Sequence, residues 1–253
     1  MGETQPYLSV VIPAYNEAKR IGSTLEAIDA YLGHQSYVSE ILVVVDGAKD
    51  NTAEVVGGYA ARMSRLRVID NRENHGKGYV VRQGMLEAKG ELRLFTDADN
   101  ATPIEEIEKL LPYVERQATS EEAQEEGYAV AIGSIGLKES NVEKSESGIR
   151  VLAGKMANLL IQIVLLPGIH DTQRGFKLFT AKAAEDIFSR CTIDRWGFDM
   201  EALALARKFH YRTKEVAIRW IHDGRSTVKA SAYVNTLLDL ARIRFGLWFG
   251  EYR

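Results

Sequence analysis

Two aspartates separated by one alanine, Asp97 and Asp99, follow directly on the apolar run in ELRLFTDADN, residues 91–100. If the chain stays extended there, the two-residue period of a strand places both carboxylates on one side, with Cα atoms about 6.5–7 Å apart. Such a pair suits one Mg²⁺ or Mn²⁺ ion that keeps positions for substrate phosphates. The structural alternative is that Asp99 caps the next helix, a role that Asn100 or Thr102 could take instead.

The elements around this pair are predicted to form an α/β fold. Four β-rich segments read as strands: YLSVVIPA (7–14), EILVVVD (40–46), LRVIDN (66–71) and ELRLFTD (91–97). Helical segments separate them; in the first, apolar side chains recur at three- and four-residue steps, at Ile21, Leu25, Ile28 and Leu32. Strands without alternation, each followed by a helix, indicate a mostly parallel central sheet with helices on both faces.

The second half of the chain continues the same domain. We expect helices over 77–90, 105–111 and 149–166, strands at AVAIGS (129–134) and TKEVAIRW (213–220), and a loop over 138–148. The segments FKLFTAKAAEDIF (176–188) and FDMEALALARKF (198–209) complete the α/β body. No repeat or linker divides the sequence, so residues 1–253 are predicted to be one domain, with 229–253 as an amphipathic helical tail.

Composition narrows the class of protein. A net charge of −3 makes nucleic acid an improbable partner. The single cysteine, Cys191, excludes an internal disulfide and fits a reducing compartment. The start of the chain has no basic and apolar leader, and the apolar segment 156–169 is shorter than the roughly 20 residues that cross a bilayer. We therefore expect a cytoplasmic protein; its oligomeric state is not readable from the sequence.

Three polar segments follow predicted strands, at PAYNE (13–17), DGAKDN (46–51) and DADN (97–100). In open parallel sheets, ligands bind beyond the carboxyl ends of the strands. These segments are therefore expected to meet in one crevice.

The blocks VVIPAYNE, VVVDGAKDNT, NHGKGYVVRQGM and FTDADNATP, in this order and spacing, resemble family-2 glycosyltransferases of the GT-A fold. Three later blocks, GIHDTQRGFKLFTAKAAEDIF, RWGFDMEALALARKF and EVAIRW, resemble the dolichyl-phosphate beta-glucosyltransferase branch, which belongs to the polyprenyl-phosphate hexosyltransferases. The similarity runs from Leu8 to Val228. It implies an inverting enzyme that moves a hexose, glucose from UDP-glucose, onto a polyprenyl or dolichyl phosphate. GDP-mannose or UDP-N-acetylglucosamine as the donor, or a saccharide as the acceptor, are alternatives.

The resemblance also assigns residues. Asp97 and Asp99 match the family's metal-binding DxD motif, for Mg²⁺ or Mn²⁺, with Asp99 also in a catalytic role. The nucleotide-sugar donor is expected to contact Pro13, Ala14, Tyr15, Asn16, Glu17, Asp46, Lys77, Gly78, Asp97, Ala98 and Trp196.

A lipid phosphate is already an anion, so it can attack the sugar without a catalytic base, but cations must then hold two anions together. Arg150 and Arg174 are the candidate catalytic cations, since a guanidinium pairs well with phosphate. Lys138 and Ser226 complete the expected acceptor-phosphate site. For Arg150 the alternative is a surface arginine at a helix start, and for Arg174 a structural partnership with Asp171.

Asp199 is expected to bind a sugar hydroxyl or to orient a basic residue. It would become the base if the acceptor were a saccharide. The alternative is an acidic residue at a helix N-terminus, favoured by the helix dipole.

Two positions depart from the family pattern: Val45 stands where relatives carry a second acid, and Ile135 where they often carry arginine. They make an inactive sugar-nucleotide-binding module conceivable. A Rossmann dehydrogenase is disfavoured because PAYNEA, not G-x-G-x-x-G, follows the first strand. The tail 232–249 mixes Arg242 and Arg244 with Leu, Trp and Phe, a composition suited to a peripheral position on the cytoplasmic face of a membrane. The alternatives are core packing and a dimer contact.

Overall fold

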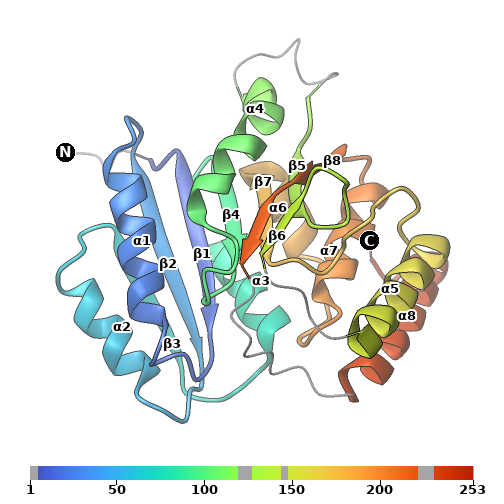
Figure 1. Ribbon diagram of the computed structural model, residues 1–253, viewed down its shortest axis with the longest axis horizontal. Helices are drawn as coiled ribbons and strands as arrows, with labels where there is room; N and C mark the ends of the chain where they lie inside the picture. Colours follow the sequence, from blue (N-terminus) through green and yellow to red (C-terminus); the bar gives the residue numbers. More distant parts are fainter. Residues whose placement is uncertain (1–4, 119–126, 144–147, 222–230, 253) are drawn as a thin grey trace.

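The computed structural model describes residues 5–118, 127–143, 148–221 and 231–252 (Figure 1). Its strands are β1 (Leu8–Ala14), β2 (Ser39–Asp46), β3 (Leu66–Asn71), β4 (Leu92–Thr96), β5 (Val130–Ser134), β6 (Asn141–Glu143), β7 (Phe176–Thr180), β8 (Thr213–Ala217) and β9 (Arg219–Ile221). Its helices are α1 (Ile21–Gly33), α2 (Thr52–Ala60), α3 (Lys77–Glu87), the 3₁₀ turn η1 (Ile104–Glu106), α4 (Ile107–Ala118), α5 (Gly148–Val164), α6 (Ala181–Phe188), α7 (Phe198–Lys208) and α8 (Ser231–Phe249).

In the described chain, the central sheet has the strand order β3-β2-β1-β4-β7-β5-β8. β1 pairs in parallel with β2 and β4, and β2 with β3, so the carboxyl ends of these strands share one edge. β7 runs antiparallel to both β4 and β5, while β8 is parallel to β5. The sheet is therefore mostly parallel, as predicted, with one reversed strand that hydropathy could not reveal.

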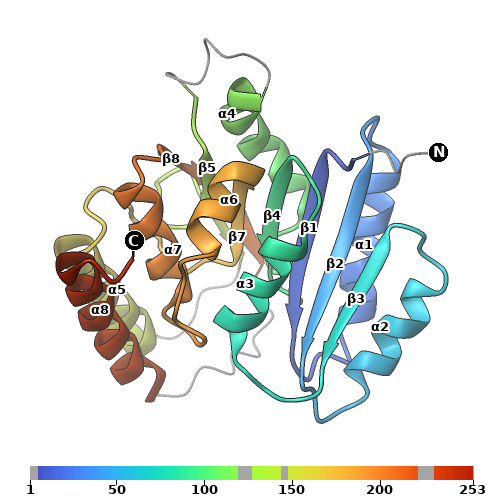
Figure 2. The same ribbon diagram turned by 180° about the vertical axis from the view of Figure 1, so that it is seen from behind.

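Helices cover both faces of the sheet, which confirms the predicted layering (Figures 1 and 2). On one face lie α1, α2 and α4, and Figure 2 shows α3, α6 and α7 on the other. The predicted inner positions of α1, Ile21, Leu25, Ile28 and Leu32, are at most 1% exposed. β1 and β2 are buried along their whole length because both of their faces carry helices.

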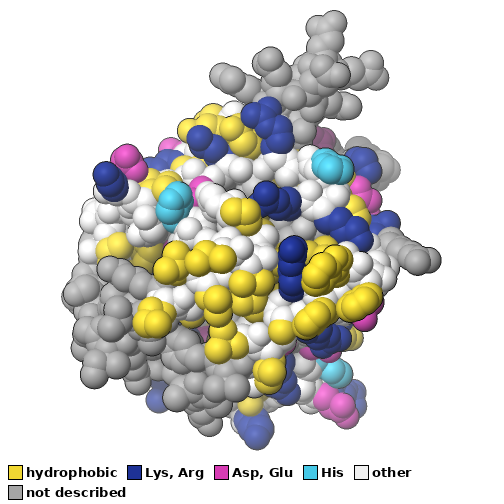
Figure 3. All heavy atoms as spheres, turned by 90° about the vertical axis from the view of Figure 1, so that its right-hand side faces the viewer, with side chains coloured by type: hydrophobic (Ala, Val, Ile, Leu, Met, Phe, Trp, Pro, Cys, Tyr) yellow, Lys and Arg dark blue, Asp and Glu magenta, His cyan; other side chains and the backbone are white. Residues whose placement is uncertain are grey.

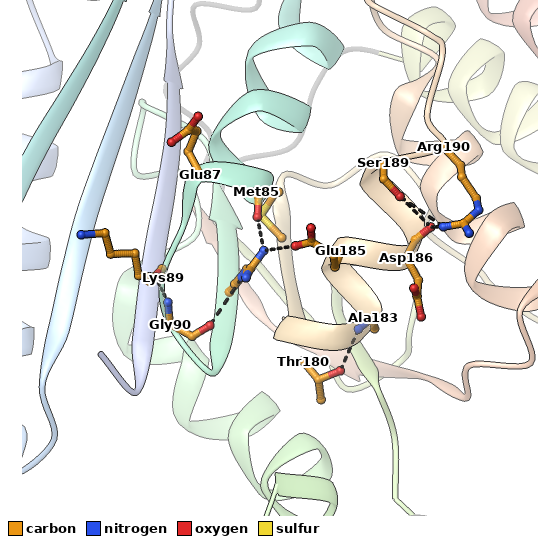
Figure 4. Close-up of polar contacts among 12 residues, drawn as sticks. Met85, Glu87, Lys89, Gly90, Thr180, Ala183, Glu185, Asp186, Ser189 and Arg190 are labelled. Carbon is orange, nitrogen blue, oxygen red and sulfur yellow. Dashed lines mark hydrogen bonds and ion pairs between the residues drawn. The ribbon is translucent and has the colours of Figure 1, made fainter. Parts of the chain in front are cut away.

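A buried arginine ties the rear helices to the sheet. Arg93 of β4 is 8% exposed, and its guanidinium donates to the carbonyl of Met85 at 2.6 Å and to the Glu185 carboxylate at 3.4 Å. Figure 4 shows these contacts to Met85 at the end of α3 and to Glu185 on α6. One cation thus satisfies a carbonyl in the last turn of α3 and anchors α6, away from the polar rim.

Three local predictions were wrong. The expected loop over 138–148 contains β6, and the expected strand over 213–220 divides at Ile218 into β8 and β9. β9 leaves the central sheet and pairs in parallel with β6. The helix expected over 77–90 ends at Glu87, because Ala88 has already left the helical conformation at ψ 138°.

α5 and α8 pack beside each other at one side of the sheet rather than on its faces (Figures 1 and 2). α8 lies within the predicted tail. In the described chain, neither these helices nor any other combines the length and apolar character that a bilayer crossing requires.

Candidate active site

The three polar segments meet at the carboxyl edge of β1, β2 and β4, as predicted. The Lys49 amide of the second segment donates to Asn16 Oδ1 of the first at 2.7 Å. The Glu17 amide donates to Thr52 Oγ1 at the start of α2 at 2.8 Å, and the Thr24 hydroxyl of α1 donates to the Ala98 carbonyl of the third segment at 2.8 Å. Asn16 has a left-handed backbone, with φ 56°, a conformation that asparagine tolerates better than most residues. The rim of the crevice is thus built of loops fixed to one another.

The Asp97–Asp99 pair does not continue the strand. β4 ends at Thr96, residues 98 and 99 form a turn, and Asn100 has φ 52°. The expectation of an extended pair was therefore wrong. The Asp99 carboxylate accepts the Ala101 N–H at 3.0 Å, and burial together with the negative Asp97 raises the pKa of Asp99. The two carboxylates nevertheless lie close enough for the charge of Asp97 to act on Asp99.

Lys77, at the first position of α3, forms an ion pair with Asp97, with 2.6 Å between Nζ and Oδ1. Burial alone would lower the pKa of Lys77, but the carboxylates of Asp97 and Asp199 outweigh it and raise that pKa. The Lys77 ammonium also lies 5.5 Å from the ring centroid of Trp196, whose side chain is 42% exposed. Gly78 follows, packed so closely that a Cβ would lie 2.3 Å from the Ile193 carbonyl oxygen.

A second lysine lies deeper in the site. Lys177 of β7 is 2% exposed and pairs with Asp199 at 2.5 Å between Nζ and Oδ1. Burial raises the pKa of the Asp199 carboxyl, against the opposing pull of Lys177 and Lys77. The ring of Phe95, opposite Lys177 in the β4–β7 register, lies beneath both ammonium groups, 5.4 Å from that of Lys77 and 5.9 Å from that of Lys177. Cations and carboxylates therefore alternate across the site.

Asp46 holds a loop of this site in place through hydrogen bonds. It is 2% exposed, and its carboxylate accepts the side-chain amide of Asn74 at 2.8 Å and the backbone amides of His75 at 2.7 Å and Gly76 at 2.9 Å. It therefore holds the loop that leads into Lys77. The neighbouring Val45 is fully buried in the core.

Among the residues expected at the donor, Pro13 and Ala14 are buried at the end of β1, while Tyr15 is 39% exposed. The Glu17 carboxylate is paired with Arg20. Tyr15 is therefore an aromatic side chain of this segment that a ligand could reach.

Of the residues expected at the acceptor phosphate, Arg174 and Lys138 have described side chains. Arg174 donates to Asp171 at 3.2 Å and its guanidinium stacks 4.6 Å from the Trp220 ring centroid, so the structure favours the alternative of a structural partnership. Lys138 is exposed in the β5–β6 connection. Arg150 lies in the first turn of α5, where side chains are not described, and Ser226 falls outside the described residues. Ile135, at the position where relatives often carry arginine, donates its backbone amide to Asp171 at 3.1 Å.

Sequence reasoning missed three residues of the site. The signal for Lys177 was a lone lysine inside an otherwise apolar strand, FKLFT. Arg20 lies close enough to Asp99 to lower the pKa of that carboxyl against the effect of burial, but its only signal was its place one residue before α1. Gly175 leaves room for Asp97: a Cβ there would lie 2.2 Å from Asp97 Oδ2.

The carboxylate oxygens of this site fit a hard divalent cation that also binds a substrate. Asp97 and Asp99 supply carboxylate oxygens, and the mutual repulsion that contributes to the raised pKa of Asp99 would be relieved by a cation between them. Within the described ranges, no cluster of three or more His, Cys, Asp or Glu side chains forms a closed cage. Mg²⁺ and Mn²⁺ accept such open sites, where water and phosphate complete the shell.

The combination of this fold and this site defines a glycosyltransferase. The family model of glycosyl transferase family 2 matches residues 9–188, and the chain belongs to that family. It is 37% identical to the dolichyl-phosphate beta-glucosyltransferase ALG5C of Trichomonas vaginalis, over 97% of this chain and 74% of that protein. It is 34% identical to the dolichyl-phosphate beta-glucosyltransferase of Homo sapiens, over 97% of this chain and 77% of that protein. The resemblance read from the motifs is confirmed.

Solved structures support the fold. Glucosyl-3-phosphoglycerate synthase from Mycobacterium tuberculosis, in complex with UDP, superposes with a TM-score of 0.66 at 16% identity and covers 95% of this chain and 80% of its own. The same enzyme with Mn²⁺, UDP and glucosyl-3-phosphoglycerate gives a TM-score of 0.67 at 18% identity, with the same coverage. The predicted GT-A fold is confirmed.

Proposed function

We propose that the protein transfers glucose from UDP-glucose to a dolichyl or other polyprenyl phosphate, with inversion at the anomeric carbon. The single observation that carries this proposal is that the two carboxylates beside the lysines of the site are both ion-paired. Asp199 is paired with the buried Lys177, and Asp97 with Lys77. A sugar hydroxyl acceptor needs a free base to remove its proton, whereas a phosphate acceptor is ionised already.

The cations of this site suit a reaction between two anions. The attacking phosphate oxygen forms the new bond to C1 of glucose while the bond from C1 to the diphosphate breaks, and UDP leaves with the electron pair. Lys77 lies beside Asp97, and its ammonium would be available to the diphosphate if a bound divalent ion held that carboxylate. Lys177 keeps Asp199 neutralised, so that this buried acid does not repel the donor.

Asp97 and Asp99 would hold the divalent ion, Mg²⁺ or Mn²⁺, and the ion would stabilise the negative charge that develops on the leaving diphosphate. Tyr15 and Trp196, two exposed aromatic side chains among the described residues of the rim, are suited to stack on the base and the sugar. The presence of Mn²⁺ and UDP in the solved synthase structure supports this arrangement.

An apolar face on α5 and α8 suits attachment to the membrane that carries the acceptor. Its exposed side chains are Met156, Leu159, Leu160 and Ile163 of α5, and Leu237, Leu238, Phe245, Trp248 and Phe249 of α8. Figure 3 shows hydrophobic side chains gathered on this side of the molecule with Lys and Arg among them. An apolar surface edged by cations matches an anionic bilayer surface, and we place it on the cytoplasmic side, where nucleotide sugars are available.

The experiment combines three labelled donors with polyprenyl phosphate in vesicles, in the presence of Mg²⁺ or Mn²⁺. Label from UDP-glucose is expected to enter the organic phase, and label from GDP-mannose and UDP-N-acetylglucosamine to stay in water. Asp97→Asn should lose this transfer. Asp186→Asn, which changes a carboxylate on α6 that pairs with Lys182, is the matched control. Transfer of label to a saccharide but not to the lipid would refute the proposal.

A further inference from the structure

A loop between α6 and α7, residues 191–197, forms one wall of the donor site. The Tyr79 amide donates to the Asp194 carbonyl at 3.0 Å, and a Cβ on Gly76 would lie 2.4 Å from that same carbonyl oxygen. Arg82 of α3 donates to the Cys191 carbonyl at 3.1 Å and to Asp194 Oδ1 at 2.8 Å. The loop also carries Trp196, which faces Lys77. Its position therefore sets where the start of α3 lies.

A buried acid outside the reaction holds this loop from behind. Glu201 of α7 is fully buried, and its carboxylate accepts the Thr192 amide, the Thr192 hydroxyl and the Ile193 amide, each at 2.9 Å. Its Oε1 also accepts the hydroxyl of Tyr252 at 2.9 Å. A buried carboxylate is costly unless it is hydrogen-bonded in this way, so the loop and Tyr252 stabilise the same charge.

The C-terminal segment is packed into this arrangement at two points. Tyr252 is 2% exposed, and Lys208 of α7 donates to its carbonyl. On α8, Asp239 lies directly against Gly197: a Cβ on that glycine would lie 2.5 Å from the Asp239 Cβ. The inner side of α8 thus rests on the last residue of the donor loop, while its outer side carries the exposed apolar face.

We infer that Tyr252, Glu201 and Asp239 are positioning residues of the donor site, and that α8 with the Tyr252 segment is part of the machinery that binds the nucleotide sugar. The contacts run from Tyr252 through Glu201 to residues 192–193, and along the loop to Trp196 and the start of α3. None of the three reaches the reacting atoms. The inference rests on the proposed function only in treating residues 191–197 as a wall of the donor site.

The test compares two tyrosine variants that each remove one hydroxyl bonded to a carboxylate. Tyr252→Phe removes the bond to Glu201; Tyr211→Phe removes the bond to Asp186 of α6 and leaves Glu201 untouched. UDP affinity is measured by calorimetry with Mn²⁺ and no acceptor, and hydrogen exchange is followed in peptides covering 191–197. Tyr252→Phe is expected to weaken UDP binding by about 2- to 30-fold, the range for mutations within a coupled network, and to speed exchange in the loop. Tyr211→Phe should change neither.

Equal UDP affinity and equal loop exchange in the two variants would overturn the inference, even if both melt at lower temperature. Asp239→Asn provides a second readout: it keeps the side-chain shape but weakens the hydrogen bond that the Asp239 carboxylate accepts from the Gly197 backbone amide, so UDP binding should weaken here too. With any acceptor that the enzyme uses, the KM for the donor should rise in Tyr252→Phe while the KM for the acceptor stays unchanged. Since UDP binding needs no acceptor, a failure of lipid glucosylation in the wild type leaves this test standing.

Discussion

Lys177→Met removes the cation from the most buried ion pair among those described. Its ammonium lies 2.5 Å from Asp199 Oδ1, and the two side chains are 2% and 6% exposed. Removal of one partner leaves an uncompensated buried carboxylate, which costs about 3–5 kcal/mol. For a domain of this size, each kcal/mol lowers the melting temperature by about 2 °C, so the variant should melt about 6–10 °C below the wild type at neutral pH.

The loss of stability in Lys177→Met should depend on pH in a defined direction. Burial already raises the pKa of Asp199, and without Lys177 that pKa rises further. A carboxyl group whose folded-state pKa is above its unfolded value destabilises the fold above the folded pKa and has no such effect below the unfolded pKa, about 4. The gap in melting temperature between variant and wild type should therefore be widest at neutral pH and narrow as the pH falls toward about 4.

Differential scanning calorimetry at pH 7.5 and at lower pH measures both effects. The double variant Lys177→Met/Asp199→Leu should recover most of the lost stability, since a packed apolar pair replaces a broken ionic one. Lys182→Met is the matched control, because its ion pair with Asp186 is exposed and should contribute less than about 1 kcal/mol. The reasoning fails if Lys177→Met melts with the wild type at neutral pH, or if the double variant loses more stability than the single one.

Three further predictions address the rim and the apolar face. Asp99→Asn should abolish transfer yet raise the melting temperature of the metal-free protein at pH 7, because burial and Asp97 raise the pKa of Asp99 and the ionisation of Asp99 therefore opposes folding. The gain in melting temperature should vanish below about pH 4, and a lower melting temperature at pH 7 would contradict the prediction. Gly175→Ala should cost about 100-fold in turnover by displacing Asp97, whereas Gly57→Ala, with open space around its Cβ, should stabilise α2 by about 0.5–1 kcal/mol; equal turnover of the two would refute the steric argument. Trp248→Glu should weaken sedimentation with anionic vesicles by at least about tenfold, the minimum expected for a large apolar side chain that enters the lipid, and unchanged binding would exclude this face.

Several elements were predictable because their signals are local. β3 begins and ends where the β-rich segment LRVIDN does, and the four apolar positions of α1 are buried as their spacing required. Continuous apolar strands indicated a sheet covered on both faces. The antiparallel direction of β7 left no such signal, because the apolar pattern of FKLFT fits parallel and antiparallel pairing equally well. β6 and β9 are too short for periodicity to distinguish them from loop.

For the site, sequence alone determined which polar segments would meet, because parallel strands bring their carboxyl ends to one edge. It also determined that Asp97 and Asp99 belong to that edge. Only the tertiary structure decided the partners: Lys77 for Asp97, and Lys177 for Asp199. Ion pairs form between strands and helices distant in sequence, and the approach of two side chains depends on strand order and packing that no single segment encodes. The link from Tyr252 through Glu201 to the donor loop is of the same kind.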